Sequence, residues 1–364
     1  LGSGQIESKV VAPVAYYPNW MPDLGRYGTY KDVPLFEEND GLHVMHPKYL
    51  VIPKVGMTVA PHLLAWAALP AIKRIYNAGF KFDLIDAHYF YPDGIAAAMI
   101  ARRLGVPFVV TARGTDINLI PKYRLARRRI VNTASEAAAM ITVCEALRDR
   151  LIELGADGDK IRALRNGVDP VIFHPVDREA ARKRLGIGKR TLVSVGHLIE
   201  RKGHHLTIQA LEKLQDINLI IIGAGPEEQR LRSLAEATGV ADRCRFEGEI
   251  DQAKLKEYYS ACDASILSSS REGMANVLLE SMACGCPVIA TDIWGTPEVI
   301  QSDEAGVLIL ERSAQGIADG VAELFSRLPD RADTVRYSSR FHWDSTTEGQ
   351  LQIFRSVVAD RHKD

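Results

Sequence analysis

The chain has 364 residues, of which 46% are hydrophobic, and this is enough for two domains of ordinary size. Its 45 Lys and Arg residues nearly balance its 46 Asp and Glu residues, so its net charge favours neither nucleic acid nor an anionic membrane as a partner. The five cysteines form no paired framework, which indicates reduced thiols in a cytoplasmic protein. The sequence also lacks a run of about eighteen apolar residues, so no membrane-spanning helix is predicted.

Short β-branched runs alternate with amphipathic segments in the first half of the chain. Buried strands are predicted at residues 9–14, 82–87, 107–112, 140–144 and 160–164. Helices are predicted at 92–105 and 145–155, and each of them ends at a glycine. This alternation is typical of a parallel sheet that is covered by helices.

The alternation restarts after residues 165–177, which contain two prolines and show no period. Strands are predicted at 191–196, 217–223, 243–248, 264–268, 287–291 and 306–310. The clearest helix covers 226–239, and the segment 341–364 is helical and amphipathic.

The predicted fold is therefore α/β, with two Rossmann-like, doubly wound domains of parallel sheet that face a cleft. We expect the first domain at residues 1–168 and the second at 169–336. Residues 337–364 are expected to form a C-terminal helix that packs back on the first domain.

A glutamate pair marks the stretch "REGMANVLLESMACGCPVIATDIWGTPEVI" at 271–300. The small residues Gly273 and Ala275 precede a predicted helix, whose N-terminus attracts phosphate. Glu280 lies about one turn inside this helix, where an ionised carboxylate could accept from a pair of ligand hydroxyls. The alternative is that Glu280 pairs with a neighbouring Lys or Arg and that Glu272 is an ordinary loop residue.

The ordered motifs of the chain resemble the retaining nucleotide-sugar glycosyltransferases of family four. The motifs that carry this resemblance from residue 9 onward are "FDLIDAHYF", "VTARGTDI", "RNGVD", "VSVGHLIERKG", "IIIGAGPEEQRL", "FEGEI" and "CDASILSSSREGMANVLLESMACGCPVIATD". The resemblance implies the GT-B fold, which consists of two Rossmann-like domains around a cleft. It also implies that the domain at 169–336 binds a nucleoside diphosphate sugar as donor. The domain at 1–168 is then the acceptor-side domain, and the acceptor is lipid-linked or a saccharide.

The resemblance assigns the glutamates and the start of the helix to the donor. Glu280 is expected to bind the ribose hydroxyls, and Glu272 the hydroxyls of the donor sugar. The diphosphate and sugar are expected to contact the backbone of Met274, Ala275, Asn276 and Val277.

Further donor contacts are expected from the segment after residue 195. Lys202 is expected to neutralise the leaving diphosphate. For the neighbouring Arg201 two interpretations stay open: it assists Lys202, or it points to solvent. His197 follows Gly196 at a position where the family commonly has arginine, and a neutral imidazole would weaken the phosphate clamp. His88 matches the family histidine that lies at the reacting sugar, so His88, Glu272 and Lys202 are the predicted catalytic residues.

Arg113 occupies a position where the family usually has histidine, on the predicted acceptor side. Two interpretations stay open: the guanidinium serves an acidic acceptor, or it pairs with Asp116. The N-terminus resembles the end of the first helix and the second strand of the fold. The first βα unit and its glycine-rich loop are therefore expected to be missing, which would weaken transfer more than donor binding.

Two further patterns suggest other classes of protein. Gly223 and Gly225 resemble part of a dinucleotide fingerprint, but Glu228 replaces its third glycine. Asp157 and Asp159 resemble the aspartate pair of metal-dependent transferases, but they lie in a polar segment that we interpret as a surface turn. We therefore expect neither a metal nor another cofactor.

The basic run at residues 122–129 places Arg124, Arg127 and Arg128 on one helical face. This face could rest on anionic lipid or bind an acidic acceptor, or it could simply be solvated. We expect a cytoplasmic protein. If the basic face rests on anionic lipid, the protein lies peripherally at the inner face of the membrane.

The predicted function is retaining transfer of a hexosyl group to an acceptor hydroxyl, in the synthesis of cell-surface polysaccharide. One alternative is a nucleotide-sugar epimerase of the same fold, which would act on the donor alone. The other is a non-catalytic subunit that binds a sugar nucleotide. The base, the sugar and the acceptor are not determined by the motifs.

Overall fold

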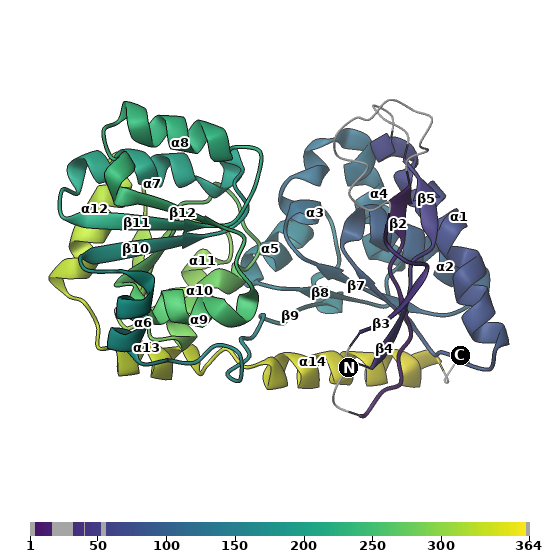
Figure 1. The fold of residues 1–364 in the computed structure, drawn as a ribbon. Coiled ribbons are helices and arrows are strands. Elements are labelled where there is room, and N and C mark those ends of the chain that lie inside the picture. Colours follow the sequence, from purple (N-terminus) through teal and green to yellow (C-terminus); the bar gives the residue numbers. More distant parts are fainter. Residues whose placement is uncertain (1–3, 17–31, 40, 52–55, 362–364) are drawn as a thin grey trace. The chain divides into compact units, whose positions relative to one another are not determined.

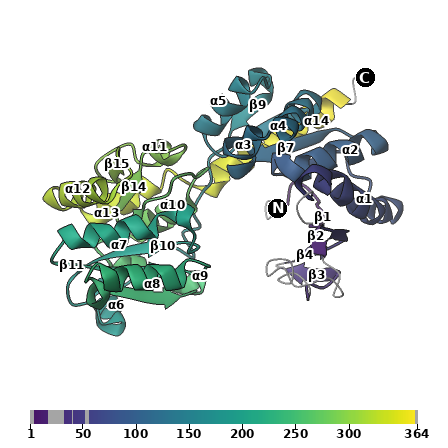
Figure 2. The same ribbon diagram turned by 90° about the horizontal axis from the view of Figure 1, so that it is seen from above.

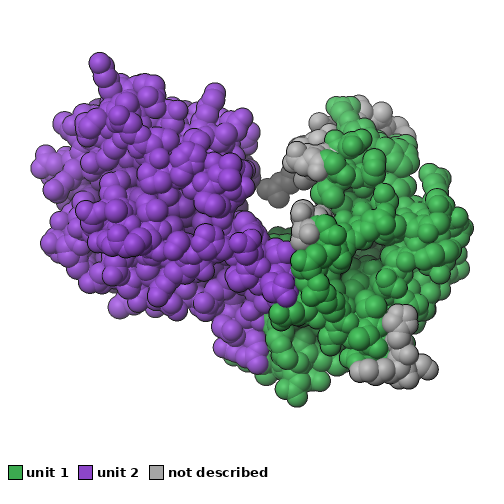
Figure 3. Space-filling model, turned by 90° about the horizontal axis from the view of Figure 1, so that it is seen from below, with its two compact units in different colours: residues 1–141, 150–162, 351–364 green, residues 142–149, 163–350 purple. Residues whose placement is uncertain are grey.

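The computed structural model describes residues 4–16, 32–39, 41–51 and 56–361 of the chain. The chain forms two compact units, which Figure 3 colours separately. Unit 1 contains Leu1–Ile141, Arg150–Arg162 and Leu351–Asp364, and unit 2 contains Thr142–Asp149 and Ala163–Gln350. Each unit is therefore assembled from segments that are separate in the sequence.

Unit 2 is built on a six-stranded sheet with the strand order β12-β11-β10-β13-β14-β15, in which every pair of neighbours is parallel. The strands are β10 (Arg190–Val195), β11 (Ile217–Ile222), β12 (Cys244–Gly248), β13 (Ala264–Leu267), β14 (Val288–Thr291) and β15 (Gly306–Ile309). All six predicted strands of the second series are confirmed. Side chains such as Leu192, Ile221 and Ile266 are almost fully buried in the core, as expected for strands covered on both faces.

Helices cover both faces of this sheet (Figure 1). One face carries α7 (His204–Ala210), α8 (Glu228–Ala237) and α12 (Ala314–Ser326), and α7 contacts each of the other two. The other face carries α6 (Arg178–Leu185), α9 (Gln252–Ala261), α10 (Asn276–Ala283) and α13 (Arg331–Ser338), with the short α11 (Thr296–Val299) before β15. The sheet is thus doubly wound.

The strand order places a topological switch point between β10 and β13. From β10 the chain proceeds outward through β11 and β12, and it then returns to the other side of β10 with β13. In open sheets of this kind, ligands bind beyond the carboxyl ends of the strands at the switch point. The segments that follow β10 and β13 are therefore the place to look for a site in unit 2.

Unit 1 contains a four-stranded sheet with the order β6-β7-β8-β9. Its strands are β6 (Ile85–His88), β7 (Phe108–Ala112), β8 (Ala139–Thr142) and β9 (Ile161–Ala163), all at predicted places. The helices are α1 (Gly56–Asn77), α2 (Ile95–Leu104), α3 (Thr115–Asn118), α4 (Arg124–Glu136) and α5 (Glu145–Glu153), of which α5 is divided between the two units after Asp149.

The described residues among the first fifty include short strands, most of which the sequence pattern did not reveal. The predicted strand at 9–14 is two strands, β1 (Val10–Val11) and β2 (Val14–Tyr16). Three more follow, β3 (Phe36–Asn39), β4 (Leu42–Met45) and β5 (Lys48–Leu50). β4 pairs with β1 in parallel and with β3 antiparallel, while β2 pairs with β5.

The C-terminal segment forms α14 (Trp343–Arg361), drawn in yellow in Figures 1 and 2. Leu351, Phe354 and Val357 are buried, whereas Val358 is only half-buried. The guanidinium of Arg361 donates to the carbonyl oxygens of Asp83 at 3.0 Å and Gly105 at 3.3 Å, so the end of α14 is anchored to unit 1. Among the described residues, no helix is both long and apolar enough to cross a membrane.

Candidate functional site

A cluster of charged side chains lies beyond the carboxyl ends of β10 and β13. The Nζ atom of Lys202 is 2.7 Å from Oε1 of Glu272, and Nη1 of Arg201 is 3.3 Å from Oε2 of the same carboxylate. Ser269 donates to Oε1 at 2.7 Å. Two cations thus flank one carboxylate, and the site keeps a positive charge that suits an anionic ligand.

Close backbone packing holds Lys202 in this cluster. Lys202 ends the 3₁₀ turn η4 (Glu200–Lys202), and its aliphatic stem packs on Gly196, where an added Cβ would lie 3.5 Å from Cε of the lysine. Gly203 follows with a φ of 76°, and a Cβ there would meet the carbonyl oxygen of Ser268 at 2.0 Å. Glycine is therefore required at position 203, and the turn fixes the lysine between both strand ends.

The glycine pair at 223 and 225 serves the same packing. A Cβ on Gly223 would lie 2.1 Å from the carbonyl oxygen of Gly196, and one on Gly225 would lie 2.4 Å from that of Leu198. These glycines let the loop after β11 approach the loop after β10. Close packing thus accounts for the part of the dinucleotide fingerprint that the sequence contains.

The loop before α10 is held rigidly. Met274 and Ala275 are buried, and Sδ of Met274 accepts from the backbone N–H of Asn166 at 3.2 Å. The side chain of Asn276 accepts from Nδ2 of Asn166 at 2.8 Å. Val277 is half-buried in the first turn of the eight-residue helix. The first turn of a helix leaves backbone N–H groups without intrahelical partners, so this terminus can receive an anion.

Glu280 lies largely buried on α10, facing α9. Its Oε2 accepts from the hydroxyl of Tyr259 at 3.4 Å. Burial raises the pKa of Glu280 to about 7, although hydrogen bonds from Tyr259 and Gln252 act in the opposite direction. Among the described residues, Glu280 forms no ion pair with a Lys or Arg side chain. The alternative that Glu280 pairs with a neighbouring Lys or Arg is therefore not observed.

His88 lies at the end of β6 in unit 1. Its Nδ1 is 2.8 Å from Nη2 of Arg113, and its Nε2 is 3.3 Å from Oδ2 of Asp86. Because a guanidinium can only donate, Nδ1 must accept and Nε2 must carry the ring hydrogen. The imidazole is thereby held as one neutral tautomer.

Asp116 is fully buried, and its carboxylate accepts backbone hydrogen bonds. Oδ2 accepts from Phe90 at 2.9 Å, and Oδ1 accepts from Gly114 at 2.8 Å and from Arg113 at 3.2 Å. Burial raises the pKa of Asp116 even so. The guanidinium of Arg113 contacts His88, and in the described part of the chain no side-chain ion pair joins it to Asp116. Of the two interpretations of Arg113, pairing with Asp116 is therefore not observed.

The predicted surface turn at Asp157 and Asp159 is confirmed. Both residues are exposed, and Oδ1 of Asp157 accepts from the backbone N–H of Asp159 at 3.0 Å. Over the residues that can be described, no three His, Cys, Asp or Glu side chains come together as a set of metal ligands.

The structure thus brings Gly196, Lys202, Arg201 and Glu272 together, with the start of α10 on the same segment as Glu272. His197 is exposed beside Gly196. Ser269, Tyr259 and Asn166 also contact this region and were not predicted from the sequence. Ser269 and Asn166 lie in motifs that carry the family resemblance, so the sequence contained a signal for these two residues. It contained no signal for Tyr259.

Comparisons with known proteins agree with this architecture. The family model described as Glycosyl transferases group 1 matches residues 177–341, and the one described as Glycosyltransferase Family 4 matches residues 30–171. The chain is 32% identical over 342 residues to a D-inositol 3-phosphate glycosyltransferase of Acidothermus cellulolyticus, covering 85% of this chain and 75% of the relative. It is 27% identical over 321 residues to the putative teichuronic acid biosynthesis glycosyltransferase TuaC of Bacillus subtilis, covering 87% and 80% of the two chains.

Solved structures support the same fold. Sucrose-phosphate synthase from Thermosynechococcus elongatus superposes with a TM-score of 0.76 at 19% identity, over 90% of this chain and 87% of that chain. HepE of Anabaena, solved in complex with UDP, gives a TM-score of 0.72 at 20% identity over 86% of both chains. The chain belongs to the family-four glycosyltransferases with the GT-B fold, and the predicted family and fold class are confirmed.

Proposed function

We propose that this glycosyltransferase moves a hexosyl group from a nucleoside diphosphate sugar to an acceptor hydroxyl with retention of configuration. The observation that carries the proposal is the convergence of Lys202 and Arg201 on Glu272, beyond β10 and β13 and next to the loop that leads into α10. A diphosphate is the ligand whose charge and size suit two cations beside a helix N-terminus.

Each group in the cluster has a task in this reaction. Lys202 and Arg201 stabilise the diphosphate as negative charge develops on it, and the first turn of α10 adds backbone N–H donors. Glu272 accepts hydrogen bonds from the donor sugar, and Glu280 accepts them from the ribose. Close packing of this cluster means that little reorganisation is needed when charge develops.

The bond changes balance without a further reactant. The bond between the anomeric carbon and the phosphate oxygen breaks, and the acceptor oxygen bonds to the same face of that carbon. The acceptor proton moves to the departing phosphate oxygen. We further propose that no metal is needed, because the cationic side chains supply the charge stabilisation that a metal would otherwise give.

His88 is assigned to the reacting sugar. Its Nε2–H, which now faces Asp86, is the group that can donate to a sugar hydroxyl. Since Nδ1 already accepts from Arg113, the ring is poised to donate rather than to act as a general base. Arg113 itself remains available, in this proposal, for an acidic group of the acceptor.

The acceptor and the pathway are proposed from the relatives. One relative is named as a putative teichuronic acid biosynthesis glycosyltransferase, and another as a D-inositol 3-phosphate glycosyltransferase. We propose a saccharide or lipid-linked acceptor in cell-surface polysaccharide synthesis, in the cytoplasm.

The experiment starts from a thermal-shift panel of UDP-, GDP- and ADP-sugars, because ligands that bind the native state raise its stability. The tightest donor is then incubated with acceptors, with and without EDTA, and the anomeric configuration of the product is read by NMR. We expect transfer with retention that EDTA does not abolish. Inversion, EDTA sensitivity or epimerised donor without acceptor would each overturn one part of the proposal, and binding without turnover would indicate a non-catalytic subunit.

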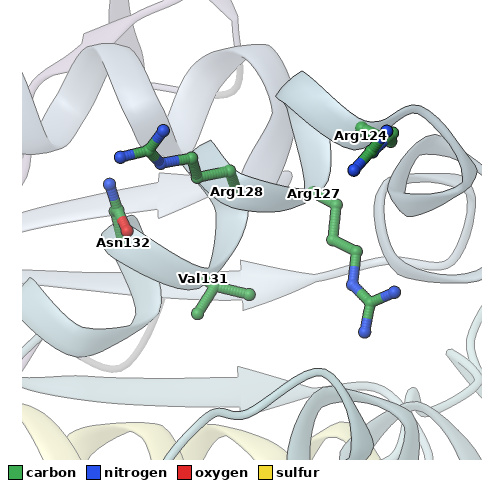
Figure 4. Close-up of a pocket in the computed structure, with 5 residues that line it drawn as sticks. All are labelled: Arg124, Arg127, Arg128, Val131 and Asn132. Carbon is green, nitrogen blue, oxygen red and sulfur yellow. The ribbon is translucent and has the colours of Figure 1, made fainter.

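A contact with anionic lipid is proposed for α4. Arg124, Arg127, Arg128, Val131 and Asn132 line a shallow pocket of about 310 Å³ on this helix (Figure 4). The neighbouring Tyr123 and Leu125 are 56% and 48% exposed. Exposed apolar side chains beside a row of arginines suit a bilayer surface, where each cation contributes about 1 kcal/mol.

Vesicle sedimentation tests this contact. The protein should bind phosphatidylglycerol-containing vesicles more strongly than phosphatidylcholine vesicles, and changing the three arginines to glutamine should remove the difference. A matched variant with Lys183, Lys189 and Lys213 changed to glutamine carries the same charge loss on unit 2 and should bind as wild type. Equal binding by both variants would leave α4 as a solvated face.

A further inference from the structure

Glu280 needs help to stay ionised. It is largely buried, and burial alone moves its pKa upward toward neutrality. A carboxylate can accept from both hydroxyls of a ribose only when it is ionised, because protonation turns one of its oxygens into a donor. Whatever hydrogen-bonds to this carboxylate therefore also sets the pH range over which it can bind a ribose.

Tyr259 is a buried group that hydrogen-bonds to the carboxylate of Glu280. Its ring is fully buried on α9, against Phe173, with 6.4 Å between the ring centroids. Its hydroxyl donates to Oε2 of Glu280 at 3.4 Å. Burial and the nearby carboxylate raise the pKa of Tyr259 well above its usual value, so the hydroxyl stays protonated and can only donate to an ionised Glu280.

We propose that Tyr259 is a positioning residue that, with Gln252 from the same helix, holds Glu280 ionised and oriented for the ribose of the donor. This inference rests on the proposed role of Glu280 as the ribose-binding carboxylate. Tyr259 acts through Glu280, because its own hydroxyl is buried on the side of the carboxylate that faces α9.

Further titratable groups lie on α9 and α13, which pack against α10, and just after α10 itself. Lys256 lies on α9, Cys284 follows the end of α10, and Arg331 lies on α13. Burial raises the pKa of Cys284, and Cys286 and Glu280 raise it further, while Arg331 and Lys256 lower it. Arg331 donates to the backbone carbonyls of Tyr259 and Cys284, at 3.0 and 3.3 Å, and its charge is thus directed at the ends of the two helices. Tyr259 and Gln252 are the groups that hydrogen-bond to Glu280 itself.

The test measures how strongly the protein prefers a ribose to a 2′-deoxyribose. UDP, GDP and ADP are each compared with their 2′-deoxy counterparts by calorimetry between pH 5.5 and 8.5, and phosphate titration cancels in each ratio of dissociation constants. A hydrogen bond to an ionised carboxylate predicts a preference of about tenfold or more at pH 8.5. The preference should fall as the pH drops through about 7, where Glu280 takes up a proton.

Tyr259→Phe should move this transition to higher pH by about 0.5 to 1 unit, since the lost hydrogen bond favoured the ionised form. At pH 7 the preference should therefore drop several-fold, and at pH 8.5 it should largely recover. Gln252→Met, at an exposed position where folding is not at risk, should move the transition in the same direction.

Tyr258→Phe is the matched control. Tyr258 is the preceding residue on α9, but its hydroxyl donates to Glu247 at 3.2 Å rather than to Glu280. Its removal should leave the transition in place. An unchanged transition in Tyr259→Phe and Gln252→Met, or an equal loss of preference at every pH, would overturn the positioning role.

Glu280→Gln separates this inference from the proposed function. If this variant keeps the wild-type preference for ribose, or if no ribonucleoside diphosphate binds, the role of Glu280 fails and the inference fails with it. If Glu280→Gln loses the preference while Tyr259→Phe keeps the wild-type transition, the proposed function stands and only the inference about Tyr259 is wrong.

Discussion

Lys202 and Glu272 are seventy residues apart in the sequence, yet Nζ of the lysine lies 2.7 Å from Oε1 of the glutamate. They meet because β10 and β13 are neighbours in the sheet and both side chains follow the carboxyl ends of these strands. Arg201 approaches the second carboxylate oxygen. The pair therefore links the two segments on either side of the switch point.

The first prediction concerns the charge of Lys202. Lys202→Met keeps the aliphatic stem on Gly196 but removes the cation, so we expect kcat to fall by about 10²- to 10³-fold. Binding of a nucleoside diphosphate should weaken, while binding of the corresponding nucleoside should not change. Lys213→Met, at an exposed position, is the control. A wild-type rate in Lys202→Met would remove the lysine from the catalytic residues.

The second prediction concerns Gly203, whose replacement by alanine combines a left-handed φ with a clash on the carbonyl of Ser268. We expect a loss of about 3–5 kcal/mol in the free energy of unfolding, together with weaker donor binding as Lys202 shifts. Gly239→Ala is the matched control, since its φ of 68° is similar but a Cβ there meets nothing within 4 Å. It should cost about 1 kcal/mol. Equal losses measured by denaturant titration would contradict the role of the close approach.

The third prediction links Glu280 to stability. Its pKa is raised from 4.5 to about 7 in the folded chain, so its contribution to stability is present below pH 4.5 and is lost as the pH rises through 7. Glu280→Gln should therefore stabilise the ligand-free protein at pH 8 by about 1–3 kcal/mol and change it little at pH 5. Melting temperatures at the two pH values give the comparison. The exposed Glu236→Gln is the control, and its effect on the melting temperature should not depend on pH. If the effect of Glu280→Gln is equally independent of pH, the carboxylate of Glu280 does not destabilise the protein.

The fourth prediction concerns His204, which is 2% exposed and has Nδ1 3.0 Å from Oγ of Ser194. Burial, with the positive charge of Lys202, lowers the pKa of His204 to about 4. The unfolded chain binds this proton near pH 6.5, so stability should fall as the pH drops from 6.5 toward 4, by about 2–3 kcal/mol in total. His204→Gln should flatten this part of the curve, whereas the exposed His342→Gln should not. Parallel curves for all three proteins would contradict the assignment.

The sequence predicted the strands of both parallel sheets because most of them are short, mainly apolar runs that end at a glycine or a polar turn. It did not predict β3, β4 and β5, whose sequences FEEN, LHVM and KYL are short and partly polar. β4 and β5 pair with the distant strands β1 and β2, while β3 pairs with the neighbouring β4, so pairing rather than local pattern holds these strands. The pairing of β1 with β4 joins residues more than thirty positions apart.

The candidate site likewise combines features that the local sequence predicted with contacts that it did not predict. The helix start and both glutamates were visible in one stretch of sequence, since a carboxylate in an apolar helix stands out locally. The contacts of Glu272 and Glu280 were not visible, because Lys202 and Tyr259 reach them only through the order of the strands and the packing of α9 on α10. Similarly, nothing in the local pattern showed that Arg113 contacts His88 rather than Asp116.

The division of α14 between the units limits how the protein can be dissected genetically. The part of α14 up to Gln350 belongs to unit 2, and the part from Leu351 onward belongs to unit 1. Arg361 anchors the helix to the carbonyl oxygens of Asp83 and Gly105. Because unit 1 also contains Arg150–Arg162, no single cut of the gene yields either unit whole. An expression fragment that stops before α14 would leave apolar surface of unit 1 uncovered, so a C-terminal truncation should impair the N-terminal half of the enzyme first.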